Sequence, residues 1–262
     1  MTTTRQLSGV LAAIAIGSAT ACHSAGEPTT ERSTTSTVTS RYAVAAYQVP
    51  ENIRNSTVVW SAEPAIDLHG EQATLVRAAV EADWIALGSP LTKSYPGYER
   101  AIDTDSKASY ERFGSEAARE FGTAYRHIMR IEPLEDGFVA HTCHQTSNVA
   151  VEREPGRYLR RIYGGDFETA ITFKRVGTAT VPGTPEPTAT AEKEESGRPQ
   201  WQAPTYDLFT GWNIIRGGWS GSEHTQACRQ WGRQLVTEAP EQGTIEVWSD
   251  TPPETLPAFP GW

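Results

Sequence analysis

Two cysteines and two histidines in the second half of the chain could form either a metal site or a disulfide bond. His141 and Cys143 are two residues apart in a segment that alternates like a strand, so their side chains face one side. His224 and Cys228 are four residues apart and share a face if their segment is helical. Together these side chains match the ligand set of a tetrahedral zinc ion. A Cys143–Cys228 disulfide is the alternative, which we favour for an exported protein because thiols oxidise outside the cytoplasm.

Asp83 is a candidate general acid or base. It lies beside Trp84 within an apolar helical stripe, and a carboxyl group buried in a cavity has a raised pKa. His127, on a segment of alternating residues, could point into the same cavity. The competing interpretation, which we favour, places Asp83 at the edge of the stripe, bonded to an arginine or to water.

The glycine-rich segment Gly218-Trp219-Ser220-Gly221-Ser222 nearly matches the nucleophile elbow G-x-S-x-G, between an expected strand and an expected helix. A serine hydrolase also needs an acid and then a histidine downstream, and His224 follows too closely. We therefore favour a tight turn in which Ser222 caps the following helix.

Tryptophan side chains offer a further type of site. The chain has eight tryptophans, and indole faces bind sugar rings or acyl chains when they line a cleft. Trp84, Trp212 and Trp219 are the candidates for ligand binding. The alternative is that they fill the core or an interface.

Cys22 carries a different type of chemistry. It follows Arg5, an apolar run over residues 10–16 and the small residues Ala19-Thr20-Ala21, which together have the three parts of a secretory signal. This segment resembles the lipobox of bacterial lipoproteins, although that family usually has leucine where Ala19 stands. The resemblance implies cleavage before Cys22 and acylation of its sulfur and new amino group. The low lysine content and the Ala/Thr/Glu-rich style resemble lipoproteins of actinobacteria.

Charge and hydropathy restrict the partners. The 262-residue chain has a formal net charge of −9, so we expect it to repel nucleic acid and anionic headgroups. The apolar stretch at residues 10–21 is too short for a bilayer core of ~30 Å, and no later segment is long and apolar enough. We therefore expect acylated Cys22 to link the protein to the outer face of the cell membrane.

The composition divides the chain into a signal peptide, a domain and three extended segments. Residues 1–21 form the signal peptide, and the Ser/Thr-rich residues 22–41 predict a flexible tether. Residues 182–204, rich in proline and glutamate, predict a long flexible insertion, and the proline-rich residues 251–262 predict an irregular tail. A single domain is expected over residues 42–250. Its last part, after the insertion, could also form a separate lobe.

Periodicity predicts two helices followed by short strands. The helices are expected over residues 65–87 and from Asp103 to Gly122. The expected strands are Tyr125–Ile131, Phe138–Thr146, Val149–Glu152, Tyr158–Ile162, Ala170–Val176 and Trp212–Arg216, with a helix over residues 223–236 after them. Helices first and an antiparallel sheet afterwards indicate an α+β domain.

This element order resembles the α+β roll of ketosteroid isomerases and scytalone dehydratases over about residues 60–220. The resemblance implies N-terminal helices packed on a curved antiparallel sheet that closes into a cone. No catalytic motif of that family can be matched in the chain.

Three possible functions follow from these observations. The first is a lipid-anchored, non-catalytic binding or scaffold module of the cell envelope, without a cofactor, for a small hydrophobic molecule, a glycan or an envelope protein. The alternative is a small cavity enzyme, an isomerase, dehydratase or cyclase, that uses Asp83 or His127. A zinc-binding protein is a third option and requires free thiolates at Cys143 and Cys228.

Overall fold

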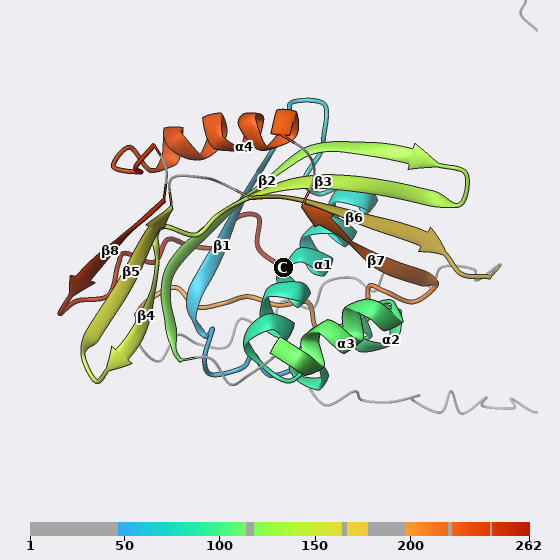
Figure 1. The fold of residues 1–262 in the computed structure, drawn as a ribbon. Helices are drawn as coiled ribbons and strands as arrows, with labels where there is room; N and C mark the ends of the chain where they lie inside the picture. Colours follow the sequence, from blue (N-terminus) through green and yellow to red (C-terminus); the bar gives the residue numbers. More distant parts are fainter. Residues whose placement is uncertain (1–46, 114–117, 164–166, 178–196, 220–221, 242) are drawn as a thin grey trace, which may run out of the picture. The chain divides into compact units, whose positions relative to one another are not determined.

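The computed structural model describes residues 47–113, 118–163, 167–177, 197–219, 222–241 and 243–262. They contain an eight-stranded sheet and four α-helices (Figure 1). In chain order the elements are β1 (Asn55–Ala62), α1 (Glu71–Gly88), the short 3-10 helix η1 (Leu91–Lys93), α2 (Tyr98–Ala101), α3 (Thr104–Phe113), β2 (Glu120–Leu134), β3 (Gly137–Gln145), β4 (Val149–Glu154), β5 (Arg157–Tyr163), β6 (Phe167–Arg175), β7 (Trp212–Trp219), α4 (Ser222–Leu235) and β8 (Thr244–Ser249).

The sheet divides into two wings beyond the long strand β2. The two halves of β2 pair antiparallel with β3 and with β4, and β1 pairs with β2 in parallel. β6 and β7 continue from β3, whereas β5 and β8 continue from β4. We call β3, β6 and β7 the closed wing, and β4, β5 and β8 the open wing. β3 and β4 thus act as one long strand with a break between them.

The bend between the wings is built around Ser147, in the break between β3 and β4. Its backbone N–H donates to Gln145 Oε1 at 2.6 Å, and its Oγ accepts the backbone N–H of Tyr163 at 3.0 Å. Opposite it, Gly122 has φ +108°, and a Cβ there would lie 2.1 Å from the carbonyl oxygen of Asn148. Any larger residue would force β2 and the break apart, so glycine is required at this close approach.

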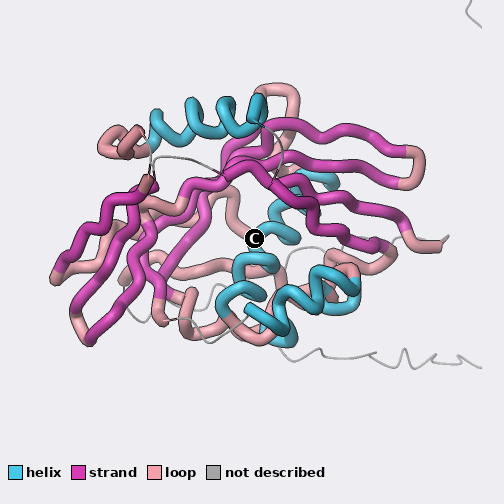
Figure 2. Tube along the Cα trace, viewed as in Figure 1, coloured by secondary structure: helices cyan, strands magenta, loops and turns pink. Residues whose placement is uncertain are grey.

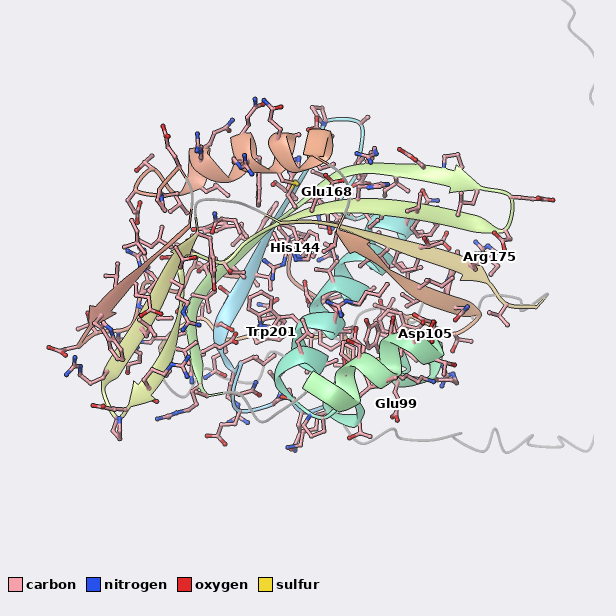
Figure 3. The ribbon with its side chains drawn as sticks, viewed as in Figure 1. Glu99, Asp105, His144, Glu168, Arg175 and Trp201 are labelled. Atoms are coloured by element: carbon pink, nitrogen blue, oxygen red, sulfur yellow. A yellow bond between two sulfur atoms is a disulfide. The ribbon has the colours of Figure 1, made fainter. Side chains whose placement is uncertain are left out.

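The main core lies between α1 and the inner face of the closed wing. α1 is buried on nearly all sides, which agrees with its alanine-rich sequence. Phe138 and Phe173 stack from neighbouring strands with ring centroids 4.5 Å apart. Figures 1 and 2 show α1, α2 and α3 on one side of the sheet and α4 on the other. Figure 3 adds the side chains of both faces, among them His144 and Glu168.

The proline-rich C-terminal segment is part of the core packing. Phe259 exchanges backbone hydrogen bonds with β1, from its N–H to Val58 O at 3.1 Å and from Trp60 N–H to its O at 2.7 Å. Trp262 Nε1 donates to Glu81 Oε2 at 2.8 Å. Trp60 and Tyr95 donate to the same buried carboxylate, so the three donors compensate for its burial. The segment is irregular, as expected, but it is fixed along β1.

The α+β prediction is confirmed, with helices packed on a curved sheet that is antiparallel apart from β1. β1, β8 and the short α2 were not predicted. The expected helix from Asp103 to Gly122 is wrong in its second half, because α3 ends at Phe113 and β2 begins at Glu120. The strands β7 and β8 join opposite edges of the same sheet, so they form no separate lobe.

Several predicted segments lie outside the described residues. These are the signal peptide, Cys22, the tether and most of the expected insertion. Among the residues that are described, no helix is long and apolar enough to cross a membrane.

Candidate ligand-binding cleft

One row of side chains crosses the open wing on a single face. The strand register pairs Glu120 of β2 with Val151 of β4, Val151 with Leu159 of β5, and Leu159 with Trp248 of β8. Residues paired across neighbouring strands point to the same face of a sheet. The row therefore runs from a carboxylate, over two aliphatic side chains, to an indole.

α1 covers one end of this row and makes it a cleft. The indole of Trp84 donates from Nε1 to Glu120 Oε2 at 2.9 Å. The cleft has a volume of about 110 Å³. Because an apolar cavity of about 150 Å³ holds benzene, this space suits one small ring or a short alkyl segment. Its lining comprises Trp84, Glu120, Thr146, Val149, Val151, Arg153, Leu159, Arg161 and Tyr163.

Glu120 is the carboxyl group of the cleft. Burial raises its pKa to about 7, against the opposing effects of the Trp84 hydrogen bond and the positive charge of Arg126. The Arg126 guanidinium lies 4.4 Å from the centroid of the Trp84 ring. Burial lowers the pKa of Arg126 to about 10, so it stays charged at neutral pH. Glu120 can therefore be a neutral hydrogen-bond donor or a charged acceptor near neutrality.

Three arginines surround the aliphatic part of the row. Arg153 and Arg161 line the cleft, and Arg157 stands beside it on β5. Arg161 Nε pairs with Glu246 at 3.0 Å, and Arg157 Nε pairs with Asp250 at 3.5 Å. Arg153 has no ion-pair partner among the described residues. Exposed ion pairs of this kind contribute little to the free energy of folding. These guanidinium groups can therefore leave their present partners and pair with a bound acid.

Comparisons with known proteins do not identify this cleft. No protein-family model, curated protein or solved structure matches the chain.

Asp83 does not line the cleft, although it is next to Trp84 in sequence. Its Oδ1 pairs with Arg216 Nε at 2.8 Å and accepts the hydroxyl of Tyr110. Tyr110 also bonds Tyr98, with 3.1 Å between their hydroxyl oxygens. Burial raises the pKa of Asp83, opposed first by Arg216 and then by the Tyr110 bond. The bond to an arginine agrees with the favoured interpretation, but Asp83 is buried and does not lie at the edge of the stripe.

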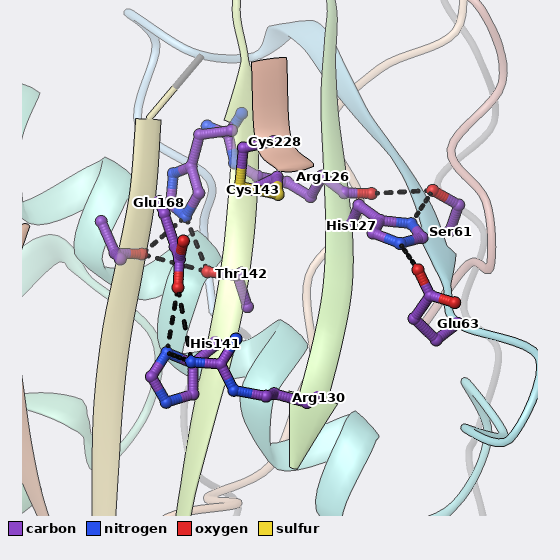
Figure 4. The surroundings of a disulfide bond; sticks show 12 residues. Ser61, Glu63, Arg126, His127, Arg130, His141, Thr142, Cys143, Glu168 and Cys228 are labelled. Carbon is purple, nitrogen blue, oxygen red and sulfur yellow. Dashed lines mark hydrogen bonds and ion pairs between the residues drawn. A yellow bond between two sulfur atoms is a disulfide. The ribbon is translucent and has the colours of Figure 1, made fainter. Parts of the chain in front are cut away.

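His127 lies on the face of the sheet that carries α4, opposite the face on which Asp83 and α1 pack. Its Nδ1 is 2.8 Å from Ser61 Oγ, and its Nε2 is 3.4 Å from Glu63 Oε1. The imidazole stacks on Trp231 of α4, with centroids 5.4 Å apart. Figure 4 shows His127 between Ser61 and Glu63. Successive residues of a strand point to opposite faces. Arg126 points toward Trp84 of α1, so its neighbour His127 points away from α1 and from Asp83.

The two cysteines form the predicted disulfide. Cys143 of β3 is bonded to Cys228 of α4 across 85 residues of sequence, with Cα atoms 5.2 Å apart. Figure 4 shows the bond where α4 meets β3. Both cysteines are therefore oxidised in the disulfide, so they cannot supply the thiolates that the zinc hypothesis requires. His141 Nδ1 lies 3.1 Å from Glu168 Oε1, and the side chain of His224 lies outside the described part of the chain.

The tryptophan candidates have different positions. Trp84 lines the cleft. Trp212 packs edge-on against Phe138 in the closed wing, with ring centroids 5.6 Å apart, so it belongs to the packing of that wing. The side chain of Trp219 lies outside the described residues, as does Ser220 of the elbow-like segment.

Sequence analysis did not identify Glu120 or its arginine neighbours. Glu120 lies within the expected second helix, which the structure ends at Phe113, and Arg153 and Arg161 were not distinguished from other surface cations. One signal was present, because Val149 and Val151 alternate and predict that one face of their strand is apolar. Nothing in the local pattern indicated that Glu120 would lie on that face.

Proposed function

We propose that the protein is an extracytoplasmic binding module, anchored through acylated Cys22, whose open-wing cleft binds the apolar part of a small amphipathic molecule. The observation that carries the proposal is the aliphatic floor of Val151 and Leu159, closed at one end by Trp84 and Glu120. Binding sites for small molecules are largely apolar, with a few polar groups that fix the orientation of the ligand. The cleft has this composition on a small scale.

The location is supported by two independent features. A disulfide persists in an oxidising compartment, and the N-terminus resembles a lipobox. A Cys22→Ser variant is expected to move the protein from the membrane fraction to the soluble fraction, measured by immunoblotting. Unchanged retention on membranes would contradict acylation at this residue.

Binding can be tested with 1-octanol, a neutral eight-carbon probe, and the full chain carrying Cys22→Ser. We expect saturable binding in isothermal titration calorimetry. Val151→Trp in this background should fill the cleft and weaken binding at least tenfold, because the new indole takes the space of the ligand.

The matched control is Val139→Trp. Val139 is a partly buried strand valine on the outer face of β3, paired with Thr172, and its substitution should leave octanol binding unchanged. Thermal unfolding of both variants checks that they are folded. Absence of octanol binding, or equal binding by the two tryptophan variants, would reject the cleft as the site.

A further inference from the structure

The row of side chains that forms the floor of the cleft continues beyond it to Trp248. Leu159 pairs directly with Trp248 on the edge strand β8, and the Trp248 side chain remains 48% exposed. An indole this exposed, in register with an apolar floor, extends the apolar surface beyond the cleft. We infer, building on the proposed function, that the full site holds one unbranched acyl chain with its acidic head at the arginines near Trp248.

The length of the row indicates the length of the chain. From Glu120 to Trp248 the row crosses three strand spacings, or about 14 Å. An extended chain of roughly eleven carbons, with bonds of about 1.5 Å, has this length. The end of the chain would lie under Trp84, and its middle would cross Val151 and Leu159.

The charges around the open end of the row favour an acid as the head group. The Arg157 guanidinium lies 5.5 Å from the centroid of the Trp248 ring, and its partner Asp250 is 88% exposed. Arg153, without an ion-pair partner in the described part of the chain, lies on the neighbouring strand. Guanidinium groups bind carboxylates and phosphates with paired hydrogen bonds.

The floor favours an acyl chain over a sugar. A sugar ring presents hydroxyl groups around its edge and needs polar partners along its length. Between Glu120 and Trp248 the row instead presents the aliphatic side chains of Val151 and Leu159. Burial of each CH₂ on such a surface strengthens binding about fourfold, which corresponds to about 0.8 kcal/mol.

The test is a chain-length series. Linear carboxylates of six to sixteen carbons, below their micelle concentrations, are titrated into the full chain carrying Cys22→Ser. We expect the dissociation constant to fall about fourfold per CH₂ and to level off near twelve carbons. The methyl end of each acid lies under Trp84, so short acids stay within the cleft and only long acids reach Trp248. In Trp248→Ala the dissociation constant should therefore level off near eight carbons, since about one strand spacing of apolar surface is lost, whereas hexanoate binding stays within about twofold.

Ile245→Ala is the matched control. Ile245 is on the same edge strand and is 44% exposed, but it pairs with Ile162 on the other face of the sheet. Its substitution should therefore not change the chain length at which the dissociation constant levels off. Arg153→Gln should weaken dodecanoate severalfold and leave 1-dodecanol unchanged. An identical plateau in wild type and Trp248→Ala, or an equal loss for hexanoate and dodecanoate, would overturn the inference.

The outcomes separate this inference from the proposed function. If 1-octanol binds but Trp248→Ala does not lower the chain length at which the dissociation constant levels off, the ligand occupies the cleft without reaching Trp248. If 1-octanol fails to bind, the proposed function itself fails. Sedimentation with phosphatidylglycerol vesicles is a further measurement. If the wild type sediments with the vesicles, Trp248→Ala does not, and monomeric acids fail to bind, the ligand is a membrane surface and not a single acyl chain.

Discussion

The two wings of the sheet are built from similar strands but use their inner faces differently. The closed wing packs Phe138, Ile171 and Ile214 against the helices, and these residues belong to the main core cluster. The open wing contributes no residue to that cluster, and Leu159 instead forms the floor of a cleft. The difference arises because, on the open wing, Trp84 of α1 contacts Glu120 at one end of the row and covers only that end. In this domain one wing provides stability and the other provides accessible surface.

The largest expected effect concerns the disulfide on the outer face of the closed wing. Cys143→Ser with Cys228→Ser should lower the free energy of unfolding by about 4–5 kcal/mol, because the bond closes a long loop in the unfolded chain. Denaturation in urea measures this. Reduced wild type is the control and should match the double variant.

Octanol binding by the folded double variant should remain within a few fold of wild type, because the bond lies away from the cleft. A loss of stability below about 1 kcal/mol, or a complete loss of binding under native conditions, would contradict this separation of the two regions.

The second prediction compares one side chain from each wing. Phe173→Ala should destabilise the protein by about 3–5 kcal/mol, since the ring is fully buried and stacked on Phe138. Val151→Ala should cost about 1 kcal/mol or less, because this valine is only partly buried. Urea denaturation measures both. Equal losses would show that the open wing is as tightly packed as the closed one.

The smallest effect concerns the protonation of Glu120. Its pKa rises from 4.5 to about 7 on folding, so the folded chain binds this proton more tightly than the unfolded chain does. The free energy of unfolding should therefore fall as the pH rises through this window, by about 3 kcal/mol, and the contribution should be constant outside it.

Glu120→Gln removes this contribution, and the difference between wild type and variant at pH 5 and pH 8 measures it. Glu81 and Asp83 also have raised pKa values, so the difference between the two proteins, and not either curve alone, is informative. Parallel curves over this range would show that Glu120 is ionised in the folded protein at pH 5.

Much of the fold could be predicted because its signals are local. The apolar stripe that includes Val76 and Val80 predicted α1, and the alternation around Phe138 predicted β3. The edge strand β8 was missed because its six residues are mostly exposed and show no clear burial pattern. The end of α3 was misplaced because Tyr110 and Phe121 match helical spacing, although Phe121 belongs to β2.

The sequence by itself determined the α+β class, the strand faces of Val149 and Val151, and the pair of cysteines available for a bond. Only the tertiary structure decided that Glu120 and Trp248, which are far apart in the chain, share one row with Leu159. It also decided that Asp83 meets Arg216, whereas its neighbour Trp84 meets the cleft. Strand register and burial depend on contacts between distant segments, and raised pKa values follow from burial. No local pattern of residues contains this information.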